Sequence, residues 1–372
     1  MEIKEIIKLI EKRKTEHIHI CAGEEVAAHR NYWRYINFIH DALPETDFDE
    51  IDLTTTLFGK NLSYPIVISA MTGGCALAKK INENLAKACE ELQIGMGVGS
   101  QRAGLLCQEL SESYEVVKDY DVPLMIGNIG APQIIPQKGK EKASVGEEEL
   151  KMAFDMIDAD VVAIHLNFLQ EIVQHEGDHR AKGVLSRLGT LSKKFPLIAK
   201  ETGAGISRKV AEKIAETEIK GIDVGGLGGT SFSAVEVYRS RLVGDEELAE
   251  IGGTFWDWGI PTPVSLIYTR SVTNLPIIAT GGVLNGLDAA KALALGANAA
   301  GIAKGVLKEA MTSADAVIRK LKNIIKEIKI VLFLTSSKNL NELKKKPLII
   351  GSEVREWLQV GGLEHEISRI SE

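Results

Sequence analysis

Short runs of apolar residues recur along most of the chain, and segments with a helical spacing of apolar positions lie between them. These segments include residues 79–93 (KKINENLAKACEELQ), 207–218 (SRKVAEKIAETE) and 287–296 (LDAAKALALG), the last of which ends at the helix-terminating Gly296. Continuous apolar strands without polar alternation are typical of a parallel sheet that is buried on both faces. Eight such runs are present, at residues 65–69, 94–98, 123–127, 160–164, 196–200, 221–224, 276–280 and 299–303.

Eight strands alternating with helices over about 240 residues predict a (β/α)8 TIM barrel, which fits the pattern better than an open doubly wound sheet. Residues 1–64 precede the barrel as a helix followed by irregular segments, and we expect this extension to contribute to the substrate site. Residues 65–372 form the second region, which contains the barrel and, from residue 308 onward, additional helices.

The fourth apolar run leads directly into HLNFLQE, residues 165–171, so an imidazole, two amides and a carboxylate follow a core segment. Burying such groups without partners is costly, and they therefore either satisfy one another or bind a ligand. His165 and Asn167 are two residues apart and would share one face of a strand. The carboxyl ends of the strands of a barrel meet on one face, where active sites form.

Glycine-rich sequences follow the last three predicted strands: GGLGGTS, TGGV and AKG. Glycine lets backbone amides approach a ligand closely, and amides at helix amino termini bind phosphate. A single glycine pair often does no more than form a tight turn. Three in succession, at the position where this fold concentrates phosphate sites, predict a ligand that carries phosphate.

Composition and charge narrow the range of partners. The formal net charge of -7 argues against general nucleic-acid binding, although it allows an anionic ligand held by local cations. Residues 330–334 (IVLFL) are too few to cross a bilayer, and the amino terminus is charged and amphipathic. No CxxC pair occurs among the four cysteines, Cys21, Cys75, Cys89 and Cys107. This usage fits a reducing compartment, and we expect a cytoplasmic protein without membrane contact.

One string suggests a different chemistry. HEGDH, residues 175–179, matches the H-E-x-x-H pattern of zinc proteases, in which a helix brings both histidines to one face. Gly177 and Asp178 disfavour a helix here, so we interpret the match as a coincidence.

Nine segments, in this order, make the chain similar to the FMN-dependent type 2 isopentenyl-diphosphate isomerases: RKTEHIHI, SAMTGG, GVGSQR, GNIGA, HLNFLQE, KETGAGIS, DVGGLGGTSF, WGIPT and ATGGV. Each segment alone is a weak signal, but together they span nearly the whole chain. The most specific are HLN-x-x-QE and the leading RK-x-EH.

The resemblance implies interconversion of isopentenyl and dimethylallyl diphosphate on reduced FMN with Mg²⁺, the flavin being reduced by NADPH or another reductant. Moving a double bond requires one proton to be added and another removed, and a glutamine has no useful pKa for this task. The reduced flavin would carry the proton. By resemblance Gln170, His165 and Asn167 are the catalytic residues, with Gln170 orienting the alkene. Glu171 would hold Mg²⁺ against the diphosphate, as a hard cation prefers.

The resemblance also assigns residues to the two ligands. The diphosphate substrate is expected to contact Arg13, Lys14, His17, Ser100, Gln101, Arg102 and Gln170. The flavin is expected to contact Ala70, Met71, Thr72, Ser100, Asn128, Lys200, Thr230, Gly281, Gly282, Ala303 and Lys304. Lys200 would stabilise the anionic reduced ring, and the last five would surround the FMN phosphate. Leu284 stands where the family often has arginine, and Lys304 would compensate.

Three alternatives remain. An inosine-monophosphate-dehydrogenase type of barrel needs a catalytic cysteine soon after its GxGS motif, and here none follows GVGSQR until Cys107. An FMN-dependent oxidoreductase acting on a small anionic substrate, such as a 2-hydroxyacid oxidase, would use a His-G-x-R arrangement that we do not find. A non-enzymatic binding barrel is disfavoured by the intact polar strand ends. Barrels of this kind commonly assemble, and we expect a homo-oligomer, a tetramer or an octamer.

Overall fold

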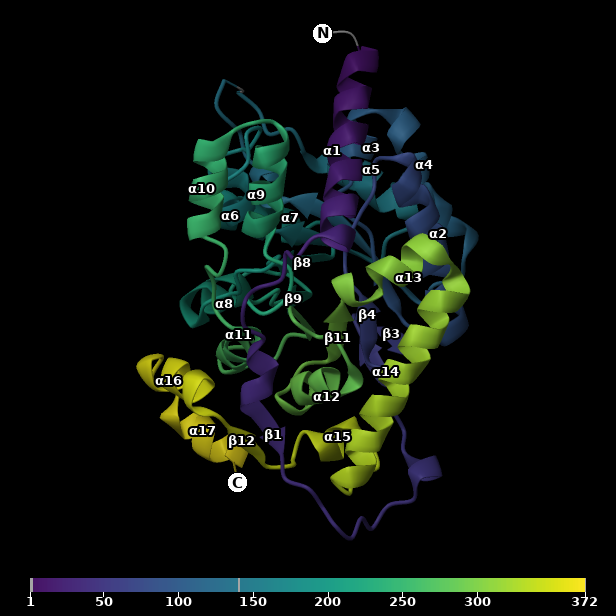
Figure 1. Cartoon of the computed structure of the whole chain (residues 1–372), viewed down its shortest axis with the longest axis vertical. Helices are drawn as coiled ribbons and strands as arrows, with labels where there is room; N and C mark the ends of the chain where they lie inside the picture. Colours follow the sequence, from purple (N-terminus) through teal and green to yellow (C-terminus); the bar gives the residue numbers. More distant parts are fainter. Residues whose placement is uncertain (1–2, 140, 372) are drawn as a thin grey trace.

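The computed structural model describes residues 3–139 and 141–371. The outer bounds of the two predicted regions, residues 1 and 372, lie outside the described residues. Its centre is a closed barrel of parallel strands in the order β10-β11-β4-β5-β6-β7-β8-β9 (Figure 1). All eight predicted strands are present: β4 (Ile66–Ile68), β5 (Gly95–Gly97), β6 (Leu124–Gly130), β7 (Val161–His165), β8 (Leu197–Lys200), β9 (Gly221–Asp223), β10 (Ile277–Thr280) and β11 (Ala299–Ile302).

The strands are apolar throughout because both of their faces are covered. Every residue of β4 to β9 and of β11 is buried, and the barrel interior contributes its own apolar cluster, which includes Val67, Leu124, Val161 and Ile198. The register joins Gly130 of β6 to His165 of β7, and His165 to Lys200 of β8. Polar groups at neighbouring strand ends are thereby brought to one edge.

Helices surround the barrel (Figure 1). They are α2 (Ala76–Leu92), α3 (Arg102–Leu106), α4 (Glu112–Glu115), α5 (Glu147–Ile157), α6 (Phe168–Ile172), α7 (Val184–Ser192), α8 (Arg208–Ala215), α9 (Phe232–Leu242), α10 (Glu246–Thr254), α11 (Thr262–Arg270), α12 (Gly286–Ala294), α13 (Leu307–Thr312) and α14 (Ala314–Leu334). The three helical segments expected from sequence correspond to α2, α8 and α12.

Local sequence fixes the ends of these helices. The Asn285 side chain accepts a hydrogen bond from the Asp288 amide at the start of α12, as an N-cap residue does. Gly296 follows the helix with a φ of +103°, a conformation that glycine adopts without strain. The sequence therefore specified this helix at both ends.

The amino-terminal extension begins with α1 (Ile3–Gly23), which packs against α2 and α9 near the carboxyl ends of the strands (Figure 1). At the opposite end of the barrel, the hairpin of β2 (Thr55–Leu57) and β3 (Lys60–Leu62) adds Leu57 and Leu62 to the interior cluster. The sequence analysis did not find this hairpin. Its two-residue loop requires positive φ at both Phe58 and Gly59, and it lacks the usual Asn-Gly signal.

Two strands that lie far apart in the sequence form a small sheet outside the barrel. Strand β1 (Ile36–Phe38) pairs antiparallel with β12 (Leu348–Ile350). Helices α15 (Leu340–Leu343), α16 (Ser352–Val360) and α17 (Glu364–Ser371) complete this part. No helix within residues 3–139 and 141–371 has the length and apolar character needed to span a membrane.

Candidate active site

A cavity opens at the carboxyl ends of the barrel strands, on the side where α1 lies. Nearly all the residues expected from sequence line it: Arg13, Lys14, His17, Ala70, Met71, Thr72, Ser100, Arg102, Asn128, His165, Asn167, Gln170, Glu171, Lys200, Thr230, Gly281, Gly282, Ala303 and Lys304. They come from α1, from the carboxyl-terminal parts of the barrel strands and from the segments that follow these strands. The fold therefore gathers residues that are up to 291 positions apart, as for Arg13 and Lys304.

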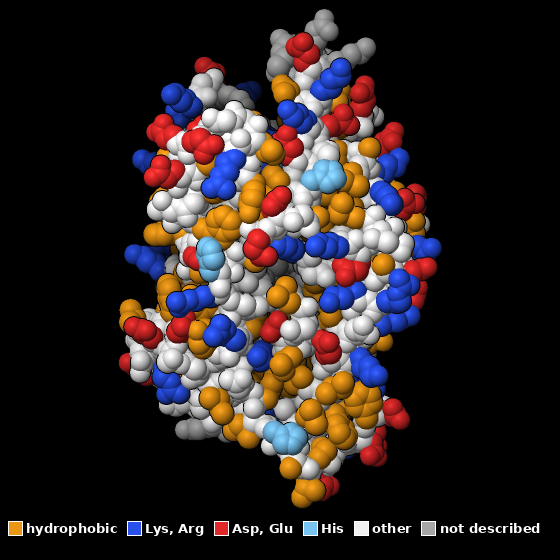
Figure 2. All heavy atoms as spheres, viewed as in Figure 1, with side chains coloured by type: hydrophobic (Ala, Val, Ile, Leu, Met, Phe, Trp, Pro, Cys, Tyr) orange, Lys and Arg blue, Asp and Glu red, His pale blue; other side chains and the backbone are white. Residues whose placement is uncertain are grey.

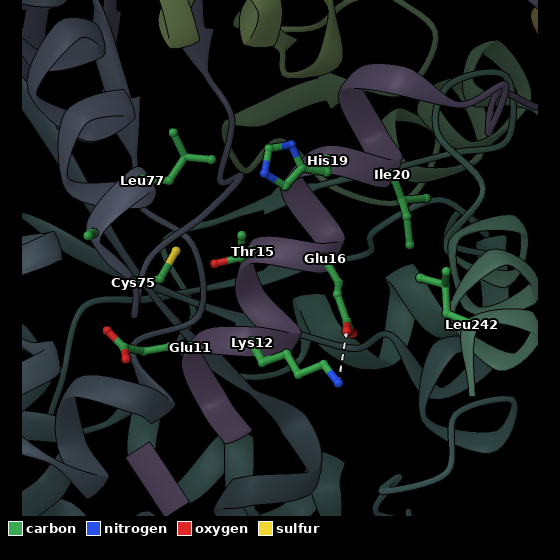
Figure 3. A pocket seen from close by; sticks show the side chains of 10 residues that line it. Glu11, Lys12, Thr15, Glu16, His19, Ile20, Cys75, Leu77 and Leu242 are labelled. Atoms are coloured by element: carbon green, nitrogen blue, oxygen red, sulfur yellow. Dashed lines mark ion pairs between the residues drawn. The ribbon is translucent and has the colours of Figure 1, made fainter. Parts of the chain in front are cut away.

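Helix α1 separates two hollows. Arg13, Lys14 and His17 face the main cavity. The opposite side of the helix borders a shallower depression lined by Thr15, His19, Cys75, Leu77 and Leu242, among others (Figure 3). This depression includes no barrel strand end, so we do not regard it as the active site. On the molecular face in Figure 2, acidic and basic side chains are interspersed.

The predicted contact between Gln101 and the substrate is corrected by the structure, because Gln101 does not line the cavity. Its side chain is fully buried, its Oε1 accepts a hydrogen bond from the Asn128 amide at 2.9 Å, and its Nε2 donates to the Ala153 carbonyl at 2.8 Å. Both ends of the amide are therefore used inside the protein. Gln101 supports the strand that carries Asn128 instead of contacting a ligand.

Asn128 and His165 form a buried pair, with 2.6 Å between Oδ1 and Nδ1. Since the Asn128 Nδ2 donates to the Val98 carbonyl, its Oδ1 is the acceptor and His165 carries its proton on Nδ1. Burial, followed by the charges of Lys14, Lys200 and Arg102, lowers the pKa of His165 to about 3. His165 is thus neutral at physiological pH and offers Nε2 as a hydrogen-bond acceptor.

The segment HLNFLQE does not continue as a strand. Strand β7 ends at His165, Asn167 is the N-cap residue of α6, and Gln170 and Glu171 lie on that helix. The expectation that His165 and Asn167 share a strand face is therefore wrong. Instead, the Asn167 Nδ2 donates to the Gln170 Oε1 at 3.2 Å, while the buried Asn167 Oδ1 has no hydrogen-bond partner among the described residues. That oxygen can accept a hydrogen bond from a ligand.

Gln170 is anchored by a residue that the sequence analysis missed. Its Nε2 donates to Oε1 of Glu236 at 2.8 Å, and Nε2 of His17 lies 3.2 Å from the same oxygen. Burial alone raises the pKa of Glu236, but His17, Arg239 and Gln170 together lower it. An ionised carboxylate thus lies beneath the cavity. The i, i+3 spacing of Glu236 and Arg239 on α9 was the available signal in the sequence.

Glu171 is 5% exposed, and its Oε2 accepts hydrogen bonds from the Gln174 Nε2 and the Asp178 amide, each at 2.8 Å. Burial is the main reason why the pKa of this carboxyl is raised. Its second oxygen, Oε1, has no hydrogen-bond partner among the described residues.

The cationic part of the cavity contains a partly buried lysine, Lys14. Desolvation by burial, followed by the charge of Arg13, lowers the pKa of Lys14 to about 8. Arg102, at the start of α3, also lowers it. A bound anion would reverse this effect, because an opposite charge favours the protonated amine.

Lys200 ends β8 and is 6% exposed. Its Nζ lies 2.6 Å from Oδ2 of Asp223 on the neighbouring strand β9 and also donates to the Glu201 carbonyl at 3.2 Å. The Glu201 carboxylate accepts hydrogen bonds from three successive amides, those of Thr202, Gly203 and Ala204.

The glycine-rich loops after β9 and β10 approach each other closely. A Cβ on Gly229 would lie 2.7 Å from the Gly282 amide nitrogen, so only glycine permits this contact. The amides of Gly282 and Val283 have no hydrogen-bond partner among the described residues, and both residues line the cavity. Such unpaired amides form an anion-binding concavity.

Residues of the amino-terminal extension support the glycine-rich loop after β10. The Asn31 Nδ2 donates to the Gly282 carbonyl at 2.7 Å, and the Trp33 Nε1 donates to the Gly281 carbonyl at 3.0 Å. Leu284 also lines the cavity and is 49% exposed. The hydrogen bonds from Asn31 and Trp33 hold the Gly282 and Gly281 carbonyls away from the cavity.

No group of three or more His, Cys, Asp and Glu side chains within the described part of the chain could hold a metal ion on its own. Residues 175–179 are not helical, as expected, and His175 pairs with Asp245 at 3.2 Å. The HEGDH string is therefore not a zinc-protease helix.

Comparison with known proteins fits this arrangement. A family model described as FMN-dependent dehydrogenase matches residues 8–115 and 252–350. The isopentenyl-diphosphate delta-isomerase of Thermoplasma volcanium is 48% identical over 352 residues, which cover 95% of this chain and 100% of that protein. The chain belongs to the isopentenyl-diphosphate delta-isomerase family. The family members from Thermoplasma acidophilum and Pyrococcus horikoshii are 46% and 48% identical, over 94% and 93% of this chain and 99% and 94% of their own lengths.

Solved structures with a similar fold include two of mandelate oxidase. Mandelate oxidase with (S)-2-phenylpropionate has a TM-score of 0.59 at 14% identity, covering 93% of this chain and 98% of that one. Mandelate oxidase with 3,3-difluoro-2-hydroxy-3-phenylpropionic acid has a TM-score of 0.58 at 13% identity, covering 94% and 99%. At this identity the likeness concerns the fold alone.

Proposed function

We propose that this chain is an isopentenyl-diphosphate delta-isomerase that interconverts isopentenyl and dimethylallyl diphosphate and uses reduced FMN. The observation that carries the proposal is a single cavity lined both by the cations of α1 and α3 and by the glycine loops after β9 and β10. A diphosphate and a flavin phosphate therefore each have a matching part of one site. Near-full-length relatives at 44–48% identity, named isopentenyl-diphosphate delta-isomerase, support it.

The residues of the cavity fit FMN. The unpaired amides of Gly282 and Val283, with Thr230 and Lys304 nearby, would hold its phosphate. Gly281, Ala303 and the segment of Ala70, Met71 and Thr72 would complete the flavin site, with Ser100, Asn128 and Lys200 at the ring. When bound and reduced, FMN supplies the group that exchanges protons with the substrate.

The substrate's diphosphate would bind Arg13, Lys14, His17, Ser100 and Arg102. Arginine offers a planar pair of donors that suits phosphate oxygens, and Lys14 regains full protonation beside the anion. Below its pKa of about 8, Lys14 contributes a positive charge at physiological pH.

Glu171 would bind Mg²⁺ through Oε1, because Oε2 is already hydrogen-bonded. A single carboxylate is sufficient, since Mg²⁺ usually completes its shell with water and substrate phosphate.

Gln170 would orient the alkene. Its amide is fixed at both ends, by Asn167 and by the Glu236 carboxylate, so it presents a constant face to the cavity. The free Asn167 Oδ1 and the His165 Nε2 add two acceptors for the substrate or the flavin. These residues would position the substrate and the flavin, and none of them has the pKa of a general acid.

The protein would work in the cytoplasm as a homo-oligomer, a tetramer or an octamer, with its flavin reduced by NADPH or another reductant. The four cysteines are free thiols, which fits a reducing compartment.

An anaerobic assay tests the proposal. Purified protein with FMN, Mg²⁺ and dithionite should convert isopentenyl diphosphate to dimethylallyl diphosphate. Omission of reductant should abolish turnover. Consumption of one reductant per product would instead identify an oxidoreductase.

A further inference from the structure

The segment that contains HEGDH is not helical, yet it contacts several residues of the site. Glu176, Gly177 and Asp178, here named the acidic turn, lie between α6 and α7. Oε1 of Glu176 lies 3.2 Å from NH1 of Arg13. Oδ2 of Asp178 lies 3.1 Å from NH1 of Arg102. Each acid of the turn is therefore paired with one of the arginines that line the cavity.

The acidic turn is folded against the end of α6. A Cβ on Gly177 would lie 1.7 Å from the carbonyl oxygen of Glu171, which is far inside van der Waals contact. The next amide, that of Asp178, donates to the Glu171 carboxylate at 2.8 Å. The Gln133 Nε2 also donates to Asp178 at 3.2 Å. The turn is thus a constructed element whose glycine cannot be replaced without displacing backbone.

Glu176 also connects two parts of the site. Its Oε1 accepts a hydrogen bond from NH2 of Arg239 at 2.9 Å, and NH1 of Arg239 lies 2.5 Å from Glu236. Glu236 in turn holds Gln170. A continuous set of charged contacts therefore joins Arg13, at the cationic part of the cavity, to Gln170.

The geometry leaves the arginines able to bind an anion. A guanidinium has five N–H donors. Arg13 contacts Glu176 through NH1, and its buried Nε has no hydrogen-bond partner among the described residues. Arg102 contacts Asp178 through NH1 as well. Each acid thus occupies one edge of its guanidinium, and other donors stay available.

We propose that the acidic turn is a positioning element for diphosphate binding. Glu176 and Asp178 fix the orientation of Arg13 and Arg102, so that their free donors face the diphosphate. This inference rests on the proposed function for the identity of the anion. The acids orient the cations and do not compete with the substrate, because an acid that blocked the site would cover the donors that remain free.

The test uses Glu176→Gln and Asp178→Asn, which keep shape and remove charge. Each should raise the KM for isopentenyl diphosphate, and the Kd for inorganic pyrophosphate, about tenfold. Turnover should stay within about twofold. The Mg²⁺ requirement and flavin absorbance should not change, because the Asp178 amide still holds Glu171. Glu176 has 36% of its side chain exposed, so its variant should fold.

Asp245→Asn is the matched control. Asp245 pairs with His175 of the same segment but contacts neither arginine, and asparagine preserves its N-cap role. Variants of the acidic turn that match this control in KM and pyrophosphate affinity would overturn the inference. Tighter pyrophosphate binding would also overturn it, since the acids would then compete with the anion. An inactive wild type would refute the proposed function, while the pyrophosphate titration would still test the turn.

Discussion

Glu236→Gln is the most informative single change in the site. The carboxylate has 1% of its side chain exposed and lies 2.5 Å from Arg239, 2.8 Å from Gln170 and 3.2 Å from His17. Glutamine keeps the volume but replaces one acceptor oxygen with a donor. The amide of residue 236 has its one oxygen on one side only, so either Arg239 or Gln170 loses its acceptor.

The substitution should affect the free energy of unfolding and the turnover rate by amounts that can be estimated separately. A hydrogen bond to a charged group contributes about 1.5–3 kcal/mol, and Arg239 keeps Glu176 as a second partner. We therefore expect the free energy of unfolding to fall by about 2–3 kcal/mol, less than the about 3–5 kcal/mol for a fully orphaned buried ion. Turnover should fall about 100-fold, because a shift of about 1 Å in a positioning group has that effect.

Urea unfolding and kcat measured on the same preparations provide the test. Glu16→Gln is the control, since Glu16 is 3.8 Å from Arg239 and partly exposed, and this change should cost less than about 1 kcal/mol. If Glu236 acts through Gln170, the double variant with Gln170→Ala should be no slower than the slower single variant. Independent, multiplicative losses would refute this pathway, and so would normal turnover in Glu236→Gln.

Four further outcomes are expected. Glu171→Gln should raise the Mg²⁺ requirement and recover partly with excess metal, whereas Gln170→Ala should lower turnover and not recover; identical metal titrations would contradict the two roles. Replacing Arg13 and Lys14 with alanine should weaken diphosphate binding, by about 1.5–3 kcal/mol for each lost contact, and leave FMN bound. An unchanged KM would mean that α1 is a solvated helix without a role in substrate binding. Because burial lowers the pKa of Lys14 to about 8, KM in a pH series should rise above that value as the amine loses its charge, and a flat profile would exclude this role. Reductant should be required but not consumed over many anaerobic turnovers, as oxidation of one equivalent per product would disprove isomerisation.

The barrel was predictable because its signal is local. A continuous apolar run such as 160–164 is stable only when both faces of the strand are covered, and eight runs separated by helical segments allow few other folds. Most of the expected site residues lie at or after the ends of those runs, so the strand ends brought them together, whereas Arg13, Lys14 and His17 come from α1. Gln101 also follows a run, but its side chain points into the protein, where it supports Asn128.

The parts that were missed depend on distant partners. Glu236 holds a residue 66 positions away, and Trp33 supports a loop 248 positions away. The hairpin at Phe58 and Gly59 lacks the residues that usually announce a tight turn. Nothing in the local sequence records the long-range contacts of Glu236 and Trp33, because each depends on how the closed barrel arranges its loops.

The polar groups after β7 show why structural and functional readings of such a segment do not exclude each other. His165 is paired with Asn128, Gln170 with Glu236, and one oxygen of Glu171 with Gln174. These contacts offset the cost of burial and fix the side chains. What they leave unpaired all belongs to groups that line the cavity: the His165 Nε2, the Glu171 Oε1 and the Asn167 Oδ1. A segment that pairs most of its polar side-chain atoms internally, and leaves the others on residues that line one cavity, has the arrangement that a preorganised binding site requires.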